Sequence, residues 1–435
     1  MPQELLQLNT RKVAIRLLLI VLLLAAIAWS YYVVRWYAGN TMADYFDPSE
    51  NNLRVAQSAV ALAPEDPLTH WRLAQATQKS LPLDQQIQAI PLYEKAVSLS
   101  PNDYRFWMAL GTASEQVGDR VKAERALRQA VTLAPAYAYP HWYLGNLLLR
   151  SGRYEEAFAE LRVASEADQE FQPQQFNLIW EIYGADPEGL KKAVGESAVA
   201  RGKFALYLLG RQKFDEGLGM WDSLSADEKK ANKETAEALV TSLVAHSRYH
   251  NAMKVWNDIA PSEKFRAEVD KVFDPGFEEA SNYGPEMAFG WQVTQVQQVQ
   301  IGIDPVKSHS GGTSLRLAFH VRSNIENLNV AQLVPVTPNT EYDFEFYVST
   351  EKLETGAPTL VQIVDPVTTG PLVTSPGAPG GTSEWTRVAL TFKTGDKMEA
   401  VQIKIVRPSC GTEDQPICPI FGSVWYDDFS IKRRG

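Results

Sequence analysis

Cysteine is nearly absent from this sequence: 435 residues include only Cys410 and Cys418. Two thiols alone make a poor zinc site, which normally has four ligands. Scarce cysteine fits a chain that is exported to an oxidising compartment, where neighbouring thiols tend to pair. Since these two stand close together in a proline-containing loop, we expect them to form a loop-closing disulfide.

The chain also lacks the motifs of common catalytic sites. It has no Gly-x-Ser-x-Gly elbow, no His-Glu-x-x-His pair, no Gly-Lys-Ser/Thr phosphate loop and no Gly-x-Gly-x-x-Gly fingerprint after a strand. His246 and His250 are four residues apart, but they flank a predicted turn between helices, and we interpret them as surface histidines. No two carboxylates stand out as the pair that a glycosidase needs. We therefore predict that the protein is not an enzyme.

Basic residues are concentrated at the N-terminus. Residues 1–40 contain Arg11, Lys12, Arg16 and Arg35 against Glu4 alone, so the rest of the chain is more acidic than the net charge of −10. Phosphate binding requires clustered Lys and Arg. The composition therefore argues against nucleic acid as a partner.

One long apolar run, VAIRLLLIVLLLAAIAWSYYVV, covers residues 13–34. As a helix it can cross roughly 30 Å of hydrocarbon, and aromatic residues follow it as an interfacial belt. We predict a membrane helix with its belt over residues 13–38. The basic residues before it should keep residues 1–12 in the cytoplasm, so that a bacterial inner membrane anchors an exported chain. A cleaved signal peptide stays open, because Ala26-Ile27-Ala28 has the form of a cleavage site.

A 34-residue repeat follows the apolar run. One unit carries Trp107, Leu110, Gly111, Gly118, Ala123, Leu127, Ala130 and Pro135. The next unit carries Leu144, Gly145, Gly152, Tyr154, Ala157, Leu161 and Ala164. An earlier unit has an insertion near Pro82, and before it stands a second helix alone, with Ala56, Ala59 and Pro64. The pattern is identified as the tetratricopeptide repeat, which implies an all-α solenoid of stacked helical hairpins over residues 48–170.

Residues 171–271 keep a helical pattern but lose this signature. Phe214, Gly217 and Trp221 recur 35 residues later as Tyr249, Ala252 and Trp256. We interpret the region as two degenerate repeats that close the solenoid.

The first helix of each repeat should line a concave groove. The predicted groove residues are Trp71, Gln75, Arg105, Met108, Thr112, Glu115, Tyr139, Trp142 and Asn146. The Lys, Asn and Arg clamp by which members of this family hold a terminal carboxylate is missing. An aromatic and amide groove of this kind suits an extended or helical protein segment. The alternative is that Trp71 and Trp142 serve only the packing between repeats.

From residue 272 the pattern changes to short alternating strands with Gly, Pro, Asn and Thr turns, which predicts an antiparallel jelly-roll sandwich over residues 272–435. Four landmarks occur in order. They are 273–278 with Gly290-Trp291, then 309–317, 332–342 and 425–431. With these landmarks the domain resembles carbohydrate-binding modules of the family 4 and 9 type, in which Trp385 would occupy a core position.

The resemblance implies two sites. Such modules commonly hold a structural calcium, for which the matching carboxylates are Glu278 with Asp427 or Asp428; the alternative is that all three are solvated charges. Alternation along the strands gives an outward polar set as the candidate glycan-binding residues. They are Arg316, His320, Glu345, Tyr347, Gln362, Gln402 and Lys404. A sandwich that has lost glycan affinity and binds protein is the alternative.

Together these patterns predict a multidomain, membrane-anchored and exported scaffold in envelope or exopolysaccharide assembly. The solenoid would dock a protein partner and the sandwich would touch glycan. No cofactor is expected to be required, and the resemblance alone offers a structural calcium. The alternative is an assembly factor that binds only protein.

Overall fold

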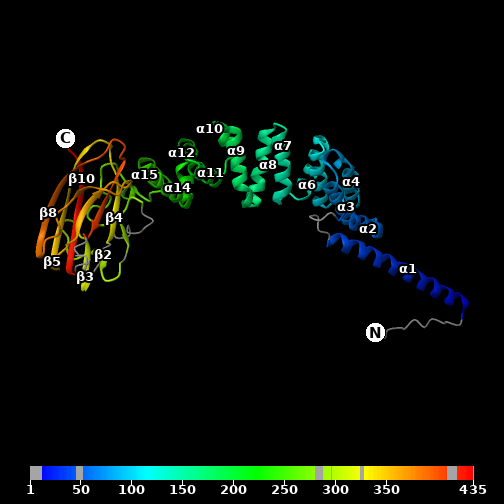
Figure 1. Ribbon diagram of the computed structural model, residues 1–435, viewed down its shortest axis with the longest axis horizontal. Helices are drawn as coiled ribbons and strands as arrows, with labels where there is room; N and C mark the ends of the chain where they lie inside the picture. Colours follow the sequence, from blue (N-terminus) through cyan, green and yellow to red (C-terminus); the bar gives the residue numbers. More distant parts are fainter. Residues whose placement is uncertain are drawn as a thin grey trace, which may run out of the picture. The chain divides into compact units, whose positions relative to one another are not determined.

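The computed structural model describes residues 12–45, 52–279, 288–294, 296–323, 328–408 and 419–434. Arg11 and the two cysteines, and with them the predicted disulfide, lie outside these residues. The chain divides into two compact units, Met1–Gly195 and Glu196–Gly435. The first is helical, and the second contains further helices followed by the strands, so the predicted order of a helical region and a β-sandwich is confirmed (Figure 1).

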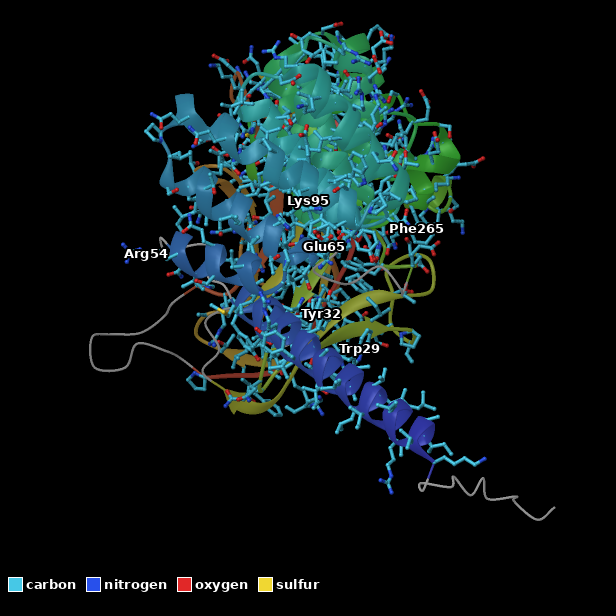
Figure 2. The ribbon with its side chains drawn as sticks, turned by 90° about the vertical axis from the view of Figure 1, so that its right-hand side faces the viewer. Trp29, Tyr32, Arg54, Glu65, Lys95 and Phe265 are labelled. Atoms are coloured by element: carbon cyan, nitrogen blue, oxygen red, sulfur yellow. The ribbon has the colours of Figure 1, made fainter. Side chains whose placement is uncertain are left out.

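Helix α1 (Val13–Asp44) contains the predicted membrane span. Its most apolar window has a mean hydropathy of 2.5, and none of that window is buried. Trp29 and Tyr32 stand exposed on this helix (Figure 2). By length and composition, α1 suits either a membrane span or a signal sequence.

The repeats fold as antiparallel helical hairpins. Their helices are α2 (Leu53–Leu62), α3 (Pro67–Ser80), α4 (Ile90–Leu99), α5 (Tyr104–Gln116), α6 (Arg120–Leu133), α7 (Ala138–Arg150) and α8 (Tyr154–Ala167), and the predicted insertion forms the 3-10 helix η1 (Leu83–Ala89). Position 111 requires glycine, as the repeat pattern predicts, because a Cβ at this position would lie 2.6 Å from Leu127 Cγ. Only glycine lets α5 and α6 approach so closely.

Further helices follow the clear repeats. In the first unit they are the 3-10 helix η2 (Gln169–Phe171), α9 (Gln172–Tyr183) and α10 (Pro187–Val194). In the second unit they are α11 (Ala198–Gly210), α12 (Phe214–Asp222), α13 (Ala226–Ala231), α14 (Lys233–Ala245), α15 (Tyr249–Asp258) and the 3-10 helix η3 (Glu263–Phe265). The recurring triplets begin α12 and α15, and Trp221 is fully buried with its indole N–H donated to Asp258 at 2.9 Å.

The sandwich consists of two five-stranded antiparallel sheets. The first has the order β1 (Gln292–Thr294), β4 (Asn329–Pro335), β9 (Ala400–Val406), β6 (Leu360–Val364), β7 (Pro371–Thr374). The second has the order β2 (Gln300–Asp304), β3 (Ser314–Ser323), β10 (Ile420–Arg433), β5 (Glu341–Thr355), β8 (Gly381–Lys393). The inner faces share one hydrophobic core that includes Trp291, Phe344 and Ile403, as alternation predicts.

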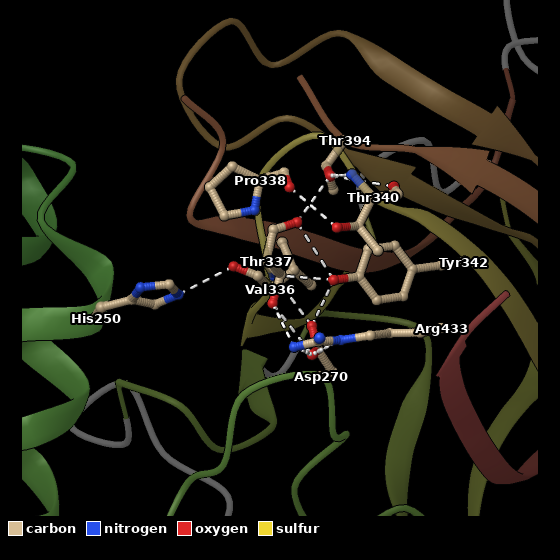
Figure 3. A network of polar contacts seen from close by, with 9 residues as sticks. All are labelled: His250, Asp270, Val336, Thr337, Pro338, Thr340, Tyr342, Thr394 and Arg433. Atoms are coloured by element: carbon tan, nitrogen blue, oxygen red, sulfur yellow. Dashed lines mark hydrogen bonds and ion pairs between the residues drawn. The ribbon is translucent and has the colours of Figure 1, made fainter. Parts of the chain in front are cut away.

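A polar network fixes the segment between α15 and the sandwich (Figure 3). Asp270 accepts hydrogen bonds from the Tyr342 hydroxyl at 2.5 Å and from Arg433 Nε at 2.6 Å. Burial raises the pKa of Asp270, but the hydrogen bonds from Tyr342, Arg433 and Thr337 outweigh it and hold the pKa below its usual range. His250 is more than the surface histidine that the sequence suggested, because its Nε2 donates to the Val336 carbonyl at 3.0 Å.

Candidate functional site

Each groove tryptophan packs against a helical segment that comes later in the chain. The Trp71 ring meets Phe106 of α5 edge-on at 5.5 Å, and the Trp142 ring stacks on Phe171 at 4.6 Å between centroids. Both indoles are half-buried, which is the arrangement that the packing interpretation requires. Tyr139 also touches Phe171, yet it keeps 54% of its surface exposed, so it offers the more accessible ring.

The polar groove residues bond mainly to their neighbours. Gln75 accepts from Arg72 at 3.0 Å and Asn146 donates to the Trp142 carbonyl at 2.8 Å. The other polar contacts join Arg105 to Asp103, Glu115 to Arg150 and Thr112 to the Ala109 carbonyl. Met108 packs, half-buried, against the core of the next hairpin. A partner that binds here would have to compete with these contacts or use the exposed tyrosine.

The predicted glycan residues do not share one face, and this corrects the sequence interpretation. Arg316, His320, Glu345 and Tyr347 lie on β3 and β5 of the second sheet. Gln362, Gln402 and Lys404 lie on β6 and β9 of the first sheet. Since the two sheets pack through their inner faces, their outward residues point to opposite sides of the sandwich.

An aromatic cluster forms on the outer side of the second sheet. His309, from the β2–β3 loop, stacks on the Tyr347 ring at 3.6 Å and meets Trp385 of β8 edge-on at 5.9 Å. Trp385 is half-buried on the edge strand and does not occupy the core position that the resemblance implied. Beside the cluster, Arg387 Nε donates to Glu345 at 3.0 Å. The aromatic cluster therefore combines rings for stacking with charged groups for hydrogen bonding.

Arg316 and His320 lie farther along the same sheet. The Arg316 guanidinium sits 5.3 Å from the Trp425 ring, and that ring is only 3% exposed. Lys307 covers the ring as well, at 4.1 Å, and the indole N–H donates to Asp304 at 2.8 Å. Arg316 therefore helps to cover Trp425.

His320 Nε2 lies 3.0 Å from the Gln300 side-chain oxygen. This contact joins β3 to the edge strand β2 and places His320 away from the aromatic cluster.

The three predicted calcium ligands gather around one loop. Glu278 accepts from the Gly312 N–H at 2.9 Å, and Asp427 accepts from the His309 N–H at 2.7 Å. Asp428 accepts from the Ser310 hydroxyl at 2.6 Å and lies 2.5 Å from His309 Nδ1. Burial raises the pKa of Asp427 to about 6, and the adjacent Asp428 charge adds to the rise.

These contacts do not fit a calcium ion. Calcium requires several oxygens directed at one point, whereas here the loop directs N–H and hydroxyl donors at the carboxylates. Among the residues that the structure describes, no group of three His, Cys, Asp or Glu side chains is arranged to hold a metal. Calcium stays a prediction of the resemblance alone.

On the first sheet, Gln402 lines a cleft of about 670 Å³ against α14. Gln292 and Leu333 form the sheet side, while Val240 and Thr241 belong to the helix. Gln362 donates to Thr374 at 3.3 Å. Lys404 is half-buried on the strand that carries Gln402.

Sequence reasoning found Tyr347 but missed its two ring partners. His309 was a fold landmark within the sequence 309–317, and Trp385 was assigned to the core. Neither strand alternation nor loop composition places a loop histidine 38 residues away in sequence against Tyr347. The clue in the sequence was that His309 has the one aromatic ring among residues 305–313, which form the loop.

Comparisons with known proteins support the repeat assignment. A sequence model of the tetratricopeptide repeat matches residues 116–179. Small glutamine-rich tetratricopeptide repeat-containing protein 2 of Mycosarcoma maydis is 32% identical over 80 residues, which cover 18% of this chain and 23% of that protein. The chain therefore contains tetratricopeptide repeats, and it spans less than a quarter of that relative's length.

Several solved structures are similar to parts of this chain at low identity. A crystal structure of MamA is 17% identical with a TM-score of 0.26, covering 39% of this chain and 82% of that one. The carbohydrate-binding module TmCBM61 in complex with β-1,4-galactotriose is 16% identical with a TM-score of 0.28, covering 38% of this chain and 100% of that one. A family 4 carbohydrate-binding module is 12% identical with the same TM-score, covering 38% and 99%.

Proposed function

We propose that this protein is an exported, membrane-anchored scaffold in envelope or exopolysaccharide assembly, with no catalytic activity of its own. Its repeats dock a protein segment, and its sandwich binds glycan at the aromatic cluster of His309, Tyr347 and Trp385. The observation that supports this proposal most directly is that His309 contacts the rings of both Tyr347 and Trp385, while Tyr347 stands opposite Arg387, which donates to Glu345. Sugar rings bind by stacking on aromatic faces while charged groups and amides bond to their hydroxyls.

The test is a glycan array screened with the full chain in detergent, followed by titration of any ligand found. Tyr347→Ala and Trp385→Ala should each weaken binding by about 1–2 kcal/mol, or roughly 5- to 30-fold in Kd. Val306→Ala is the matched control, since Val306 is 90% exposed on the same loop as His309. Equal affinity of the parent and both ring variants would refute the cluster as the glycan site.

A specific contact favours the second candidate, an assembly factor that binds only protein. His309 covers one face of the Tyr347 ring at 3.6 Å, so that face is not open to a sugar. His309→Ala separates the two cases, because removal of the imidazole should strengthen glycan binding if the sugar stacks on that face. An array on which neither the parent nor His309→Ala binds any glycan would favour the protein-binding candidate.

A further inference from the structure

The C-terminal third of α1 belongs to the repeat stack as well as to the apolar helix. The apolar run ends at Val34, but α1 continues without interruption to Asp44. Within this last part Gly39 and Ala43 are buried, whereas Trp36 and Tyr37 stay exposed. One side of the helix end is therefore packed against protein.

The packing at Gly39 repeats the geometry of the established hairpins. A Cβ on Gly39 would lie 2.8 Å from the Ala59 carbonyl oxygen and 2.7 Å from Ala63 Cβ. In the next hairpins, a Cβ on Gly111 would meet the carbonyl of Ala123 and the side chain of Leu127, four residues later. In each case the glycine meets a carbonyl of the second helix and the side chain four residues later, so the contact is of the same kind, although Ala59 and Ala63 stand at the end of α2 and Ala123 and Leu127 stand in the first turns and the middle of α6. This identifies α1 and α2 as the first and second helices of a repeat.

Polar contacts tie the same part of α1 to α2 and α3. Arg35 donates to the Ala61 carbonyl at 2.8 Å, near the end of α2. Asn40 donates to Asp66 at 2.8 Å, and Arg72 of α3 donates to the Ala43 carbonyl at 3.1 Å. A first helix in this repeat contacts both its own second helix and the first helix of the next unit. The end of α1 makes both kinds of contact.

We propose that α1 is at once the membrane anchor and the first helix of the solenoid, so that the first repeat is held rigidly at the lipid headgroups. The proposal rests on α1 being retained as a membrane span. Arg35 directly follows the apolar run, and Gly39 lies about 8 Å beyond Val34 along the helix. The headgroup layer is roughly 5–8 Å thick. The end of α2 near Ala61, which Arg35 holds, therefore lies at the bilayer surface.

The test uses the full chain in vesicles of phosphatidylcholine and phosphatidylglycerol that contain a headgroup-nitroxide lipid. An environment-sensitive fluorophore is attached at Ala61→Cys, or at Val121→Cys, which is 73% exposed at the start of α6 and therefore on the opposite edge of the stack from the end of α2. Both native cysteines are replaced by serine. The label at position 61 should be quenched several-fold more than the label at position 121. A flexible Gly-Ser insertion of about twelve residues after Val34 should abolish that difference while the protein still floats with the vesicles.

Single substitutions make the test specific to the helix contact. Gly39→Leu should reduce quenching at position 61, because the side chain must push α1 away from α2, and Tyr37→Leu on the exposed side of α1 should leave it unchanged. Equal quenching at the two labels in floating protein, or no effect of the insertion, would overturn the proposal. Failure to float at all would instead contradict the membrane anchor in the proposed function.

Discussion

Replacement of Gly111 tests the repeat packing most directly. A Cβ at this position would lie 2.6 Å from Leu127 Cγ and 2.8 Å from its Cδ2, whereas carbon atoms pack best at about 3.5–4.0 Å. Leu127 is fully buried, so it has no open space into which it can move. The two helices must then separate by about 1 Å, an overpacking error that costs about 1–3 kcal/mol.

Helix propensity acts in the opposite direction and sets the net effect. Glycine is about 1 kcal/mol less favourable than alanine inside a helix, so Gly111→Ala should be destabilising by no more than about 2 kcal/mol. Gly111→Leu inserts more atoms into the same space and should cost about 3 kcal/mol. Gly219→Ala is the matched control, because nothing lies within 4 Å of a Cβ at that position in α12. It should be stabilising by up to about 1 kcal/mol.

Hydrogen exchange followed by mass spectrometry measures the stability of individual helices. A melting curve of the whole chain does not, because it combines the unfolding of two units. Peptides from α5 and α6 should exchange faster in Gly111→Leu by roughly a hundredfold, corresponding to about 3 kcal/mol. Peptides from α12 should exchange more slowly in Gly219→Ala. Unchanged exchange of α5 and α6 in Gly111→Leu would show that these two helices do not pack closely at position 111.

Three further outcomes are expected. Asp270 has a lowered pKa in the folded protein, so its network should stabilise the sandwich fully at any pH above the ordinary Asp pKa. This stabilisation should be lost as the pH falls through the pKa of Asp270 in the folded protein. Asp270→Asn should therefore make unfolding, followed by near-ultraviolet circular dichroism, less dependent on acid pH. Chelation with EDTA should leave the melting of the sandwich unchanged, because loop donors already satisfy Glu278 and Asp427; a fall of several degrees would establish a bound calcium. Alkaline phosphatase fused after residue 45 should be active in a bacterial host; an inactive fusion, with a cytoplasmic reporter active at the same junction, would contradict export and the disulfide with it.

The sequence was sufficient to predict the features that depend on residues close to one another in the chain. The repeat spacing placed Gly111 and Leu127 correctly, because one hairpin's contacts lie within a few tens of residues of each other. Alternation also sorted Phe344 and Ile403 to the core, since successive side chains point to opposite faces. It could not say which sheet a strand joins, and for this reason Glu345 and Gln402 were assigned to one face.

The role of the α1 end was hidden by the apolar run that precedes it. Gly39 stands 25 residues before Pro64, and Gly111 stands 24 residues before Pro135, so the repeat spacing itself nearly extends to Gly39. The apolar run nevertheless dominates any hydropathy pattern. A contact between helices carries little sequence signal when its residues are as small as glycine and alanine, because many unrelated positions satisfy that requirement.

The aromatic cluster shows why a binding face is harder to derive than the fold that carries it. Regular pairing of β5 with β8 sets Tyr347 opposite Arg387, whereas Trp385 lies where the register of the two strands shifts. His309 reaches both rings because Asp427 and Asp428 hold its loop. Those carboxylates are far from the loop in sequence, and their interpretation as metal ligands gave the loop no role. The loop therefore links the two features, since Asp427 and Asp428 hold His309, and its imidazole covers one face of the Tyr347 ring.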